Sequence, residues 1–467
     1  MKNNNLKLFM IMGTLIALVA CSNSPRNSTS NVIGPSSNLD TSSIDGSFEI
    51  SVEGVKELRN PEGLSHRPSS YEFYYTEDFR SFASKMRDFS AKLSEAIAKR
   101  EYKSGKNYVV SPLSIELCLG LAIRSSSGET RKELLDVLDI DYDTFNRNYK
   151  LYFNYLYEDV KNNMGNTVAQ LLLTNSIWID DEASLKDDCL DALRDDYYCY
   201  SYEADFNGKN KETNQAIREF VKQATKGLID QDLRIPADTI LTLMNTIYLK
   251  SIWNETGSDL GYAPESYQFK NSNGSISLKQ LLIGNLNEGR AIYNEDYSSF
   301  HTSGKGGIRI YFIKANEGKN IKDVFNKDTI NHILNNQNYV YKDDEKLERY
   351  YTQCYFPEYE AYTDLDLVKV FKEDFNVTSL FNRSACDFSN LSNYRLYCSD
   401  FRQIAKLKVD KTGIEGAAVT YMTYAGDAGP DGYTEVYEKF IVDQEFGYVI
   451  TSDSSIIFSG IITNIDK

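Results

Sequence analysis

Few side chains in this sequence are spaced for acid–base or nucleophilic chemistry. The chain has three histidines, His66, His301 and His332, and a Ser-His-Asp or Cys-His site needs one of them beside its nucleophile. No G-x-S-x-G, H-E-x-x-H, P-loop or EF-hand motif occurs in the sequence. Carboxylates are abundant, so pairs that resemble a catalytic acid and base arise by chance. We therefore expect no enzymatic activity, no bound metal and no cofactor.

The local settings of the histidines agree with this. His66 lies in a polar segment, and His332 lies in an Asn-rich stretch with a helical pattern. His301 is expected in a loop, because residues 304–307 (GKGG) follow it and lack the Lys-Ser/Thr pair of a phosphate-binding loop. Each histidine is expected to be an ordinary surface or hydrogen-bonded residue.

One cysteine stands at a processing signal. Lys2 and Lys7 precede an apolar run over residues 8–20, which is too short to span a bilayer comfortably. The run ends in Leu18-Val19-Ala20-Cys21, which resembles the lipobox of bacterial lipoproteins. Acyl chains on Cys21 would give stable membrane attachment. We expect residues 1–20 to be a removed signal peptide and the mature protein to be lipid-anchored outside the cytoplasm. A plain secretory signal is the alternative.

Six further cysteines have no spacing that predicts their chemistry. An even number permits disulfides in an exported protein, but the spacing matches no compact disulfide framework and no zinc motif. Cys118 lies in an apolar helical run and is expected to be a small core residue. The pairing of the others stays open. The six are Cys118, Cys189, Cys199, Cys354, Cys386 and Cys398.

The composition indicates one globular domain behind a tether. A net charge of −16 argues against nucleic acid as a partner, because such proteins present a clustered basic face. Residues 21–70 are rich in Ser and Asn and mostly polar, which predicts a flexible tether. Residues 71–467 contain no internal repeat and no dividing segment. We take them as one domain and expect a monomer.

Residue periodicity predicts helices first and mostly strands later. An amphipathic helix is expected over residues 79–97, a second apolar helix opening at Ser111-Pro112, and a third starting at a capping box formed by Thr130 and Glu133. This order indicates the α+β class. Strands are expected over residues 171–179, 241–249, 308–313, 404–409, 440–442, 446–451 and 456–462, the last two joined by an Asp/Ser turn.

A series of segments resembles the serpin family, in the family's order, from about Phe79 to the end of the chain. Residues 107–115 (NYVVSPLSI) resemble the start of the family's helix B, and residues 243–250 (LMNTIYLK) with Trp253 resemble its LVNAIYFK strand. The resemblance implies a serpin fold: helices packed on three β-sheets, with an exposed reactive-centre loop near the C-terminus. The other segments are residues 128–135 (GETRKELL), 204–206 (ADF), 225–229 (TKGLI), 356–359 (FPEY), 380–381 (LF) and 386–389 (CDFS).

The resemblance also assigns a hinge within residues 409–420 (VDKTGIEGAAVT). In serpins this segment slides, after cleavage, between two strands of a formed sheet, which requires small or β-compatible side chains and no proline. Alternate residues from Ile414 to Tyr424 would face the core. Without the upstream segments, the same residues would be interpreted as a plain β-hairpin arm. The hinge residues are Gly413, Ile414, Glu415, Gly416, Ala417, Ala418, Val419 and Thr420.

The bait bond is expected in the long polar loop that follows the hinge. Family spacing counted from the hinge places it at Asp427-Ala428, whereas counting back from Phe446 places it near Thr434. We favour Asp427, because the length of the inserting strand is constrained on the hinge side. An Asp-preferring protease would then be the target, whereas a bond after Tyr424 or Tyr433 would imply a chymotrypsin-like one.

The resemblance implies a suicide inhibitor of a serine or cysteine protease that contributes no catalytic residue of its own. Lys411, Ile414 and Gly416 depart from the usual hinge residues, and Gln403 stands where the family has a histidine under the opening sheet. The alternative is a non-inhibitory serpin-fold module for binding or adhesion on the cell surface. The residues assigned to the sheet-opening region are Ser111, Ser114, Asn245, Trp253 and Gln403.

Overall fold

The computed structural model describes residues 48–61, 72–162, 165–253, 259–335, 340–343, 346–398, 401–414, 434–453 and 455–466. The chain divides into the units Met1–Ile44 and Asp45–Lys467, and all described residues belong to the second. No helix within these ranges is long and apolar enough to cross a membrane. Cys21, His66, Asp427, Ala428 and residues 415–420 lie outside the described residues.

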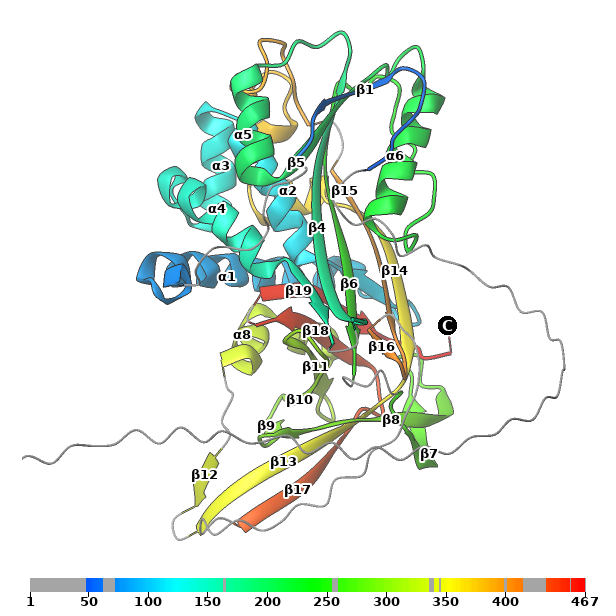
Figure 1. Cartoon of the computed structure of the whole chain (residues 1–467). Coiled ribbons are helices and arrows are strands. Elements are labelled where there is room, and N and C mark those ends of the chain that lie inside the picture. The colour runs from blue at the N-terminus through cyan, green and yellow to red at the C-terminus, as the bar shows by residue number, and fades with distance from the viewer. Residues whose placement is uncertain are drawn as a thin grey trace, which may run out of the picture. The chain divides into compact units, whose positions relative to one another are not determined.

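The largest sheet carries helices on both faces (Figure 1). Its strands follow the order β1-β5-β4-β6-β16-β15-β14, and β3 pairs with one part of β4. Among the described residues of this sheet, only the β4–β5 pairing is parallel. The strands are β1 (Val55–Arg59), β3 (Glu158–Lys161), β4 (Thr167–Asp180), β5 (Cys199–Ala204), β6 (Leu241–Ile252), β14 (Tyr359–Asp366), β15 (Arg402–Val409) and β16 (Gly413–Ile414).

Two smaller sheets contain the other strands of the described residues. One has the order β2-β19-β18-β11-β10-β9, and the other has the order β12-β13-β8-β7 with β17 on β13. Their strands are β2 (Tyr108–Val110), β7 (Tyr262–Lys270), β8 (Ile276–Glu288), β9 (Ile292–Tyr293), β10 (Tyr297–Ser303), β11 (Ile308–Ala315), β12 (Val340–Asp343), β13 (Lys346–Phe356), β17 (Thr434–Ile441), β18 (Phe446–Ser452) and β19 (Ser455–Ile462).

The helices divide between two hydrophobic clusters on opposite faces of the large sheet. On β4, Ile177 belongs to the main cluster with α1 and α2, whereas its neighbour Trp178 belongs to a second cluster with α6. This follows from the alternation of side chains along a strand. The helices are α1 (Glu77–Glu101), α2 (Pro112–Ser125), α3 (Gly128–Leu138), α4 (Tyr142–Leu156), α5 (Asp187–Tyr197), α6 (Asn210–Ala224), α7 (Ile321–Val324), α8 (Lys327–Asn335) and α9 (Val368–Asp374), with 3-10 turns η1 (Glu72–Tyr75) and η2 (Ser379–Phe381).

The first two predicted helices are confirmed, and the predicted cap of the third is wrong. The Ser111 hydroxyl accepts a hydrogen bond from the Ser114 N–H and so caps α2, with Pro112 in its first turn. However, α3 begins at Gly128, so Thr130 lies inside it. The Thr130 hydroxyl instead accepts a hydrogen bond from the Asp387 N–H, and the Glu133 carboxylate accepts from the N–H groups of residues 378 and 379. Tertiary partners use the side chains that a capping box would need.

The predicted strands are present, with differences at their ends and at His301. The 440–442 strand extends back to Thr434, and the final pair, β18 and β19, is antiparallel as expected. His301 lies on β10 and not in a loop; the glycines that follow it form the turn to β11. Burial lowers the pKa of His301 to about 3, which keeps its imidazole neutral. His332 lies on α8, as expected.

Residues 48–61 differ from the predicted tether of residues 21–70. Here the chain packs on the domain, and β1 pairs with β5. Phe48, Ile50, Val52 and Val55 reach the second hydrophobic cluster. The alternation of Phe48, Ile50 and Val52 with polar residues is short and lies next to a long polar segment, so the sequence did not predict this strand.

Candidate strand-insertion site

The strands β6 and β15 share one short neighbour, β16. Gly413 pairs with Ile252, and Ile414 pairs with Ser251, on the β6 side. Ile414 also pairs with Val409 on β15. Because β16 is antiparallel to both neighbours, β6 and β15 run in the same direction. In the part of the chain that the structure describes, no other strand lies between their facing edges.

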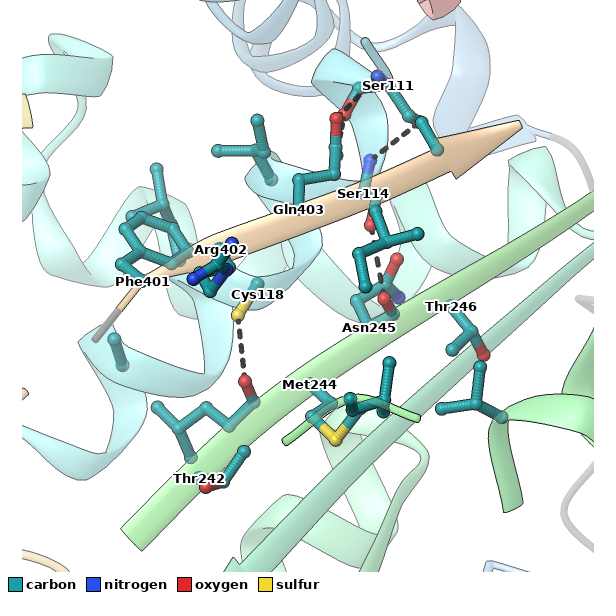
Figure 2. A pocket seen from close by; sticks show the side chains of 18 of the residues that line it. Ser111, Ser114, Cys118, Thr242, Met244, Asn245, Thr246, Phe401, Arg402 and Gln403 are labelled. Carbon is teal, nitrogen blue, oxygen red and sulfur yellow. Dashed lines mark hydrogen bonds between the residues drawn. The ribbon is translucent and has the colours of Figure 1, made fainter. Parts of the chain in front are cut away.

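A cavity of about 200 Å³ occupies the space between these strands. The cavity is lined by residues 241–247 of β6 and by the first turns of α2. It is also lined by residues 401–406, which begin just before β15 and continue into it. The segment 228–239, which follows α6, also lines it. Figure 2 shows Ser114 and Cys118 of α2 between the two strands. The sheet is therefore incomplete along about half the length of β6.

Gln403 connects β15 to the start of α2. Its amide oxygen accepts a hydrogen bond from the Ser111 N–H, and its amide nitrogen donates to the Ser111 carbonyl, both at 2.8 Å (Figure 2). The Ser111 hydroxyl donates to the carbonyl of Ile457 on β19 at 2.7 Å. The neutral amide of Gln403 thus satisfies both the backbone N–H and the backbone carbonyl of the buried Ser111.

Asn245 makes the corresponding connection from β6. The Ser114 hydroxyl donates to the Asn245 carbonyl at 3.2 Å, and the Asn245 amide donates to the Asn175 side-chain oxygen at 2.9 Å. The side-chain oxygen of Asn245 is buried and has no hydrogen-bond partner among the described residues. Since a buried acceptor without a donor costs free energy, this atom is a place where a further donor would stabilise the sheet.

Cys118 lines the same cavity, whereas the sequence predicted a small core residue. Its side chain is partly exposed, and its thiol donates to the Leu243 carbonyl at 3.6 Å. Burial of the sulfur atom raises the pKa of the Cys118 thiol to about 12, so it stays protonated. The described cysteines form no disulfide.

A tight turn leads from β15 into β16. The Asp410 carboxylate accepts hydrogen bonds from the N–H groups of Thr412 at 2.8 Å and Gly413 at 3.3 Å, and Lys408 lies 2.9 Å away. Partial burial opposes ionisation of Asp410, but the hydrogen bonds from Thr412 and Lys408 outweigh it and lower its pKa. The Trp253 indole donates to the Asp410 carbonyl at 2.8 Å. Trp253 therefore supports the hinge turn directly.

Gly413 is required by the close approach of β6. A Cβ at this position would lie 2.3 Å from the Ser251 carbonyl oxygen and 3.0 Å from the Ile252 Cα. Ile414, the next residue, is buried and belongs to the main hydrophobic cluster. The hinge thus enters the sheet with its even-numbered side chain on the α2 face.

Lys411 lies at the turn and outside the strand. Its ammonium group is 2.6 Å from Asp259, which raises the pKa of Lys411, and its N–H donates to Glu358 at 3.0 Å. Its departure from the usual hinge residue thus affects the turn and not the space into which a strand would enter.

Thr434 stands at the far end of the long loop, at the start of β17. This strand pairs in parallel with β13 from Glu348 opposite Thr434 to Tyr355 opposite Ile441. Two different sheets therefore hold the ends of the loop: the large sheet holds Ile414, and a smaller one holds Thr434.

A cover over the cavity was missed in the sequence. The segment 228–239 crosses from α6, and the amide nitrogen of Gln231 donates to the Tyr362 hydroxyl on β14 at 2.8 Å. Because β14 lies beyond β15, this hydrogen bond spans the open position of the sheet. The apolar residues of the segment, at 228, 229, 233 and 235, have neither helical nor strand period, so no local pattern indicated their role.

Comparison with known sequences gives one family. The family model described as "Serpin (serine protease inhibitor)" matches residues 84–465. Among curated proteins, an uncharacterized serpin-like protein of Thermococcus kodakarensis is 24% identical over 365 residues, covering 74% of this chain and 80% of that protein. Iripin-8 of Ixodes ricinus is 27% identical over 370 residues, covering 76% and 87%.

Comparison with solved structures gives the same fold. The native state of tengpin, a thermophilic serpin, aligns with a TM-score of 0.66 at 20% identity and covers 86% of this chain and 96% of tengpin. Serpin48 of Tenebrio molitor also aligns at 0.66 with 20% identity, covering 83% and 99%. Thyroxine-binding globulin in complex with thyroxine aligns at 0.65 with 18% identity, covering 82% and 99%. The expected arrangement of helices on three sheets is confirmed.

Proposed function

This chain belongs to the serpin family, and we propose that it inhibits extracellular proteases, chiefly serine endopeptidases, by suicide cleavage, strand insertion and covalent trapping. The observation that carries this proposal is the open position between β6 and β15, which β16 enters at one end only. The activity is that of a trap, so it needs no catalytic residue of its own.

The register of β16 predicts where an inserted strand would lie. Continuing both antiparallel ladders places Gly416 between Leu249 and Leu407, and Ala418 between Ile247 and Ala405. These four neighbours are buried, so only small side chains fit between them on this face. Ala418 and Gly416 meet that requirement.

Two polar residues of the hinge also fit their predicted neighbours. Thr420 would lie between Asn245 and Gln403 on the α2 face, where its hydroxyl could donate to the unpaired Asn245 oxygen. Glu415 would lie on the other face between Lys250 and Lys408, an opposite-charge arrangement that favours cross-strand pairing. Both matches support insertion in this register.

The same register supports a bait bond on the hinge side. Residue 424 would reach the first residue of β6, Leu241, so the strand position is filled at that point. Asp427-Ala428 follows shortly, whereas Thr434 is paired in β17 and is a poor fit for an extended protease cleft. We propose Asp427-Ala428 as the bait bond.

The chemistry of trapping occurs in the protease. Its catalytic serine oxygen attacks the bait carbonyl carbon, the C–N bond breaks, and the amine takes a proton from the protease histidine. An ester then joins the loop to the protease. Insertion of about ten residues, at about 1 kcal/mol net per new hydrogen bond, supplies on the order of 10 kcal/mol to displace the protease before water attacks the ester.

Lipid attachment at Cys21 is part of the same proposal. An anchored inhibitor would act at the membrane surface outside the cytoplasm, against proteases that approach the cell. The target protease is identified here only by its chemistry, a nucleophilic serine or cysteine.

A binding or adhesion module remains the second candidate. The structural similarity to thyroxine-binding globulin, solved with thyroxine, is the observation that favours it. Such a function would not need the hinge to enter the sheet.

The deciding experiment is a thermal melt before and after cleavage in the loop, with denaturing gels for each protease tested. We expect a rise in melting temperature of tens of degrees and a covalent complex with at least one protease. Ala418→Glu should abolish both by placing a charge between buried residues, whereas Glu415→Gln should retain them. Cleavage without stabilisation or complex in the wild-type chain would falsify trapping and favour the binding module.

A further inference from the structure

The segment formed by residues 48–59, here called the N-terminal strap, precedes the residues matched by the family model, which begin at 84. It runs along the outer edge of the large sheet, where β1 pairs with β5 from Val55 opposite Ala204 to Arg59 opposite Ser201. Figure 1 shows it between the top of β4 and β5 and the helix α6. The strap therefore adds an edge strand that joins two elements of the domain.

The strap holds α6 through an aromatic contact. The Phe48 ring lies 4.7 Å from the Phe220 ring of α6 and 4.8 Å from the Tyr200 ring of β5, the latter edge to face. Phe220 itself packs edge to face on Trp178 at 5.8 Å. Phe48 thus closes one end of the cluster that seats α6 on the sheet.

Hydrogen bonds fix the same point. The Glu49 N–H donates to the Gln223 side-chain oxygen at 3.2 Å, and the Gln223 amide donates to the Glu49 carbonyl at 3.1 Å. Gln223 lies in the last turn of α6, directly before the segment that lines the cavity. Glu53 also pairs with Lys209, at the start of α6, at 2.8 Å. Both ends of α6 are tied to the strap.

The other end of the strap is anchored away from α6. Arg59 lies 2.8 Å from Asp187 and 2.7 Å from Asp191 of α5. Lys56 pairs with Glu203 of β5 at 3.3 Å and is exposed. The strap is thus held at β5 and α5 as well as at α6.

We propose that the N-terminal strap controls the rate of loop insertion by restraining α6 and the cover that follows it. The inference rests on the proposed function, because a strand that enters between β6 and β15 must pass under the cover at residues 228–239. The cover begins four residues after α6 ends, so a restraint on the last turn of α6 also limits the movement of the cover, and the strap bonds to this turn. Removal of the strap, by mutation or by proteolysis ahead of β1, makes insertion faster.

The test compares strap variants that differ in their contact with α6. Phe48→Ala removes the ring contacts, and Gln223→Ala, at an exposed position, removes the paired hydrogen bonds with little effect on folding. Lys56→Ala is the matched control, since it changes the strap without touching α6. Hydrogen exchange of residues 210–224 and the rate at which the heat-stable form develops after loop cleavage are measured for each full-length chain.

We expect faster exchange in α6 and insertion about three- to tenfold faster for Phe48→Ala and Gln223→Ala, as loss of one ring contact or a hydrogen-bond pair from a barrier predicts. Lys56→Ala should match the wild type. Equal insertion rates in all four proteins, or faster α6 exchange with an unchanged insertion rate, would overturn the proposal. Failure of the wild-type chain to form a heat-stable state would instead refute the proposed function.

Discussion

Gln403 bonds both the N–H and the carbonyl of Ser111, each at 2.8 Å, and so links the strand beside the open position to the first turn of α2. Both residues are buried. The pairing satisfies two backbone groups with one neutral amide, and its strength does not change with pH. This relationship determines how the native sheet is held at the edge of the cavity.

Gln403→Ala should destabilise the native state by about 1–3 kcal/mol, because it leaves a buried N–H and carbonyl without partners. Urea unfolding measures the change. Gln403→His should recover part of the loss at pH 8, where the ring is neutral, and less of it below pH 6, since the charged ring has no acceptor. A pH-independent deficit for the histidine variant would contradict this account of the hydrogen bonds.

Gly413→Ala should expel β16 from the sheet, because the new Cβ would lie 2.3 Å from the Ser251 carbonyl oxygen. We expect faster hydrogen exchange at Ile414 and a lower melting temperature. Gly261→Ala is the control, since nothing lies within 4 Å of a Cβ built there. Similar exchange at Ile414 in both variants would show that the close approach does not select glycine.

Glu116 should make stability fall as pH rises. Burial raises its pKa to about 8, against hydrogen bonds from Ser90 and Tyr152 that lower it, from a reference value of 4.5. Between these values the native state holds a proton that the unfolded chain releases, so the free energy of unfolding decreases by up to about 1.4 kcal/mol per pH unit. The contribution is complete below about pH 4.5 and lost by about pH 8.

Glu116→Gln should remove this slope while keeping the neutral hydrogen-bonding group. Urea unfolding at pH 5, 6, 7 and 8 compares the two proteins. Parallel pH profiles would mean that Glu116 is ionised in the native state.

Tyr362→Phe should speed insertion several-fold with little change in stability, because it removes the hydrogen bond from Gln231 that spans the cavity. The hydroxyl is exposed, so the unfolding free energy should change by less than about 1 kcal/mol. Tyr394→Phe, another exposed tyrosine, is the control. The measurement is the rate at which the heat-stable form appears after loop cleavage. Equal rates for the two variants and the wild type would show that the Gln231–Tyr362 hydrogen bond does not slow insertion.

The sequence predicted most of the fold because its local patterns agree with the tertiary structure. The apolar spacing of α1 and the Ser111-Pro112 start of α2 are sufficient in themselves. Thr130 was misassigned because Asp387, far away in the sequence, binds its hydroxyl. His301 was misassigned because adjacent glycines suggested that the loop began earlier.

The site was only partly predictable for the same reason. The positions of Gln403, Ser111 and Asn245 came from family resemblance, but the bonds that join them depend on three elements meeting. The strap alternates apolar and polar residues only over the short stretch from Phe48 to Val52, and the cover has no regular period. Their roles follow from contacts with α6 and β14, which no local pattern contains.

The pairing of Ile414 in one sheet and of Thr434 in another sets the length of chain that is available for insertion before the loop is cut. A strand filled to residue 424 would be about 33 Å long, and the ten residues from there to Thr434 could span at most about 36 Å fully extended. In an uncut chain with this strand filled, those ten residues would reach back only about to the level of Ile414. If the chain traps proteases as proposed, this connectivity would keep the uncut loop out of the sheet. Cutting the loop, or detaching β17 from β13, would then permit insertion, and a protease that cuts without being retained would use up the inhibitor.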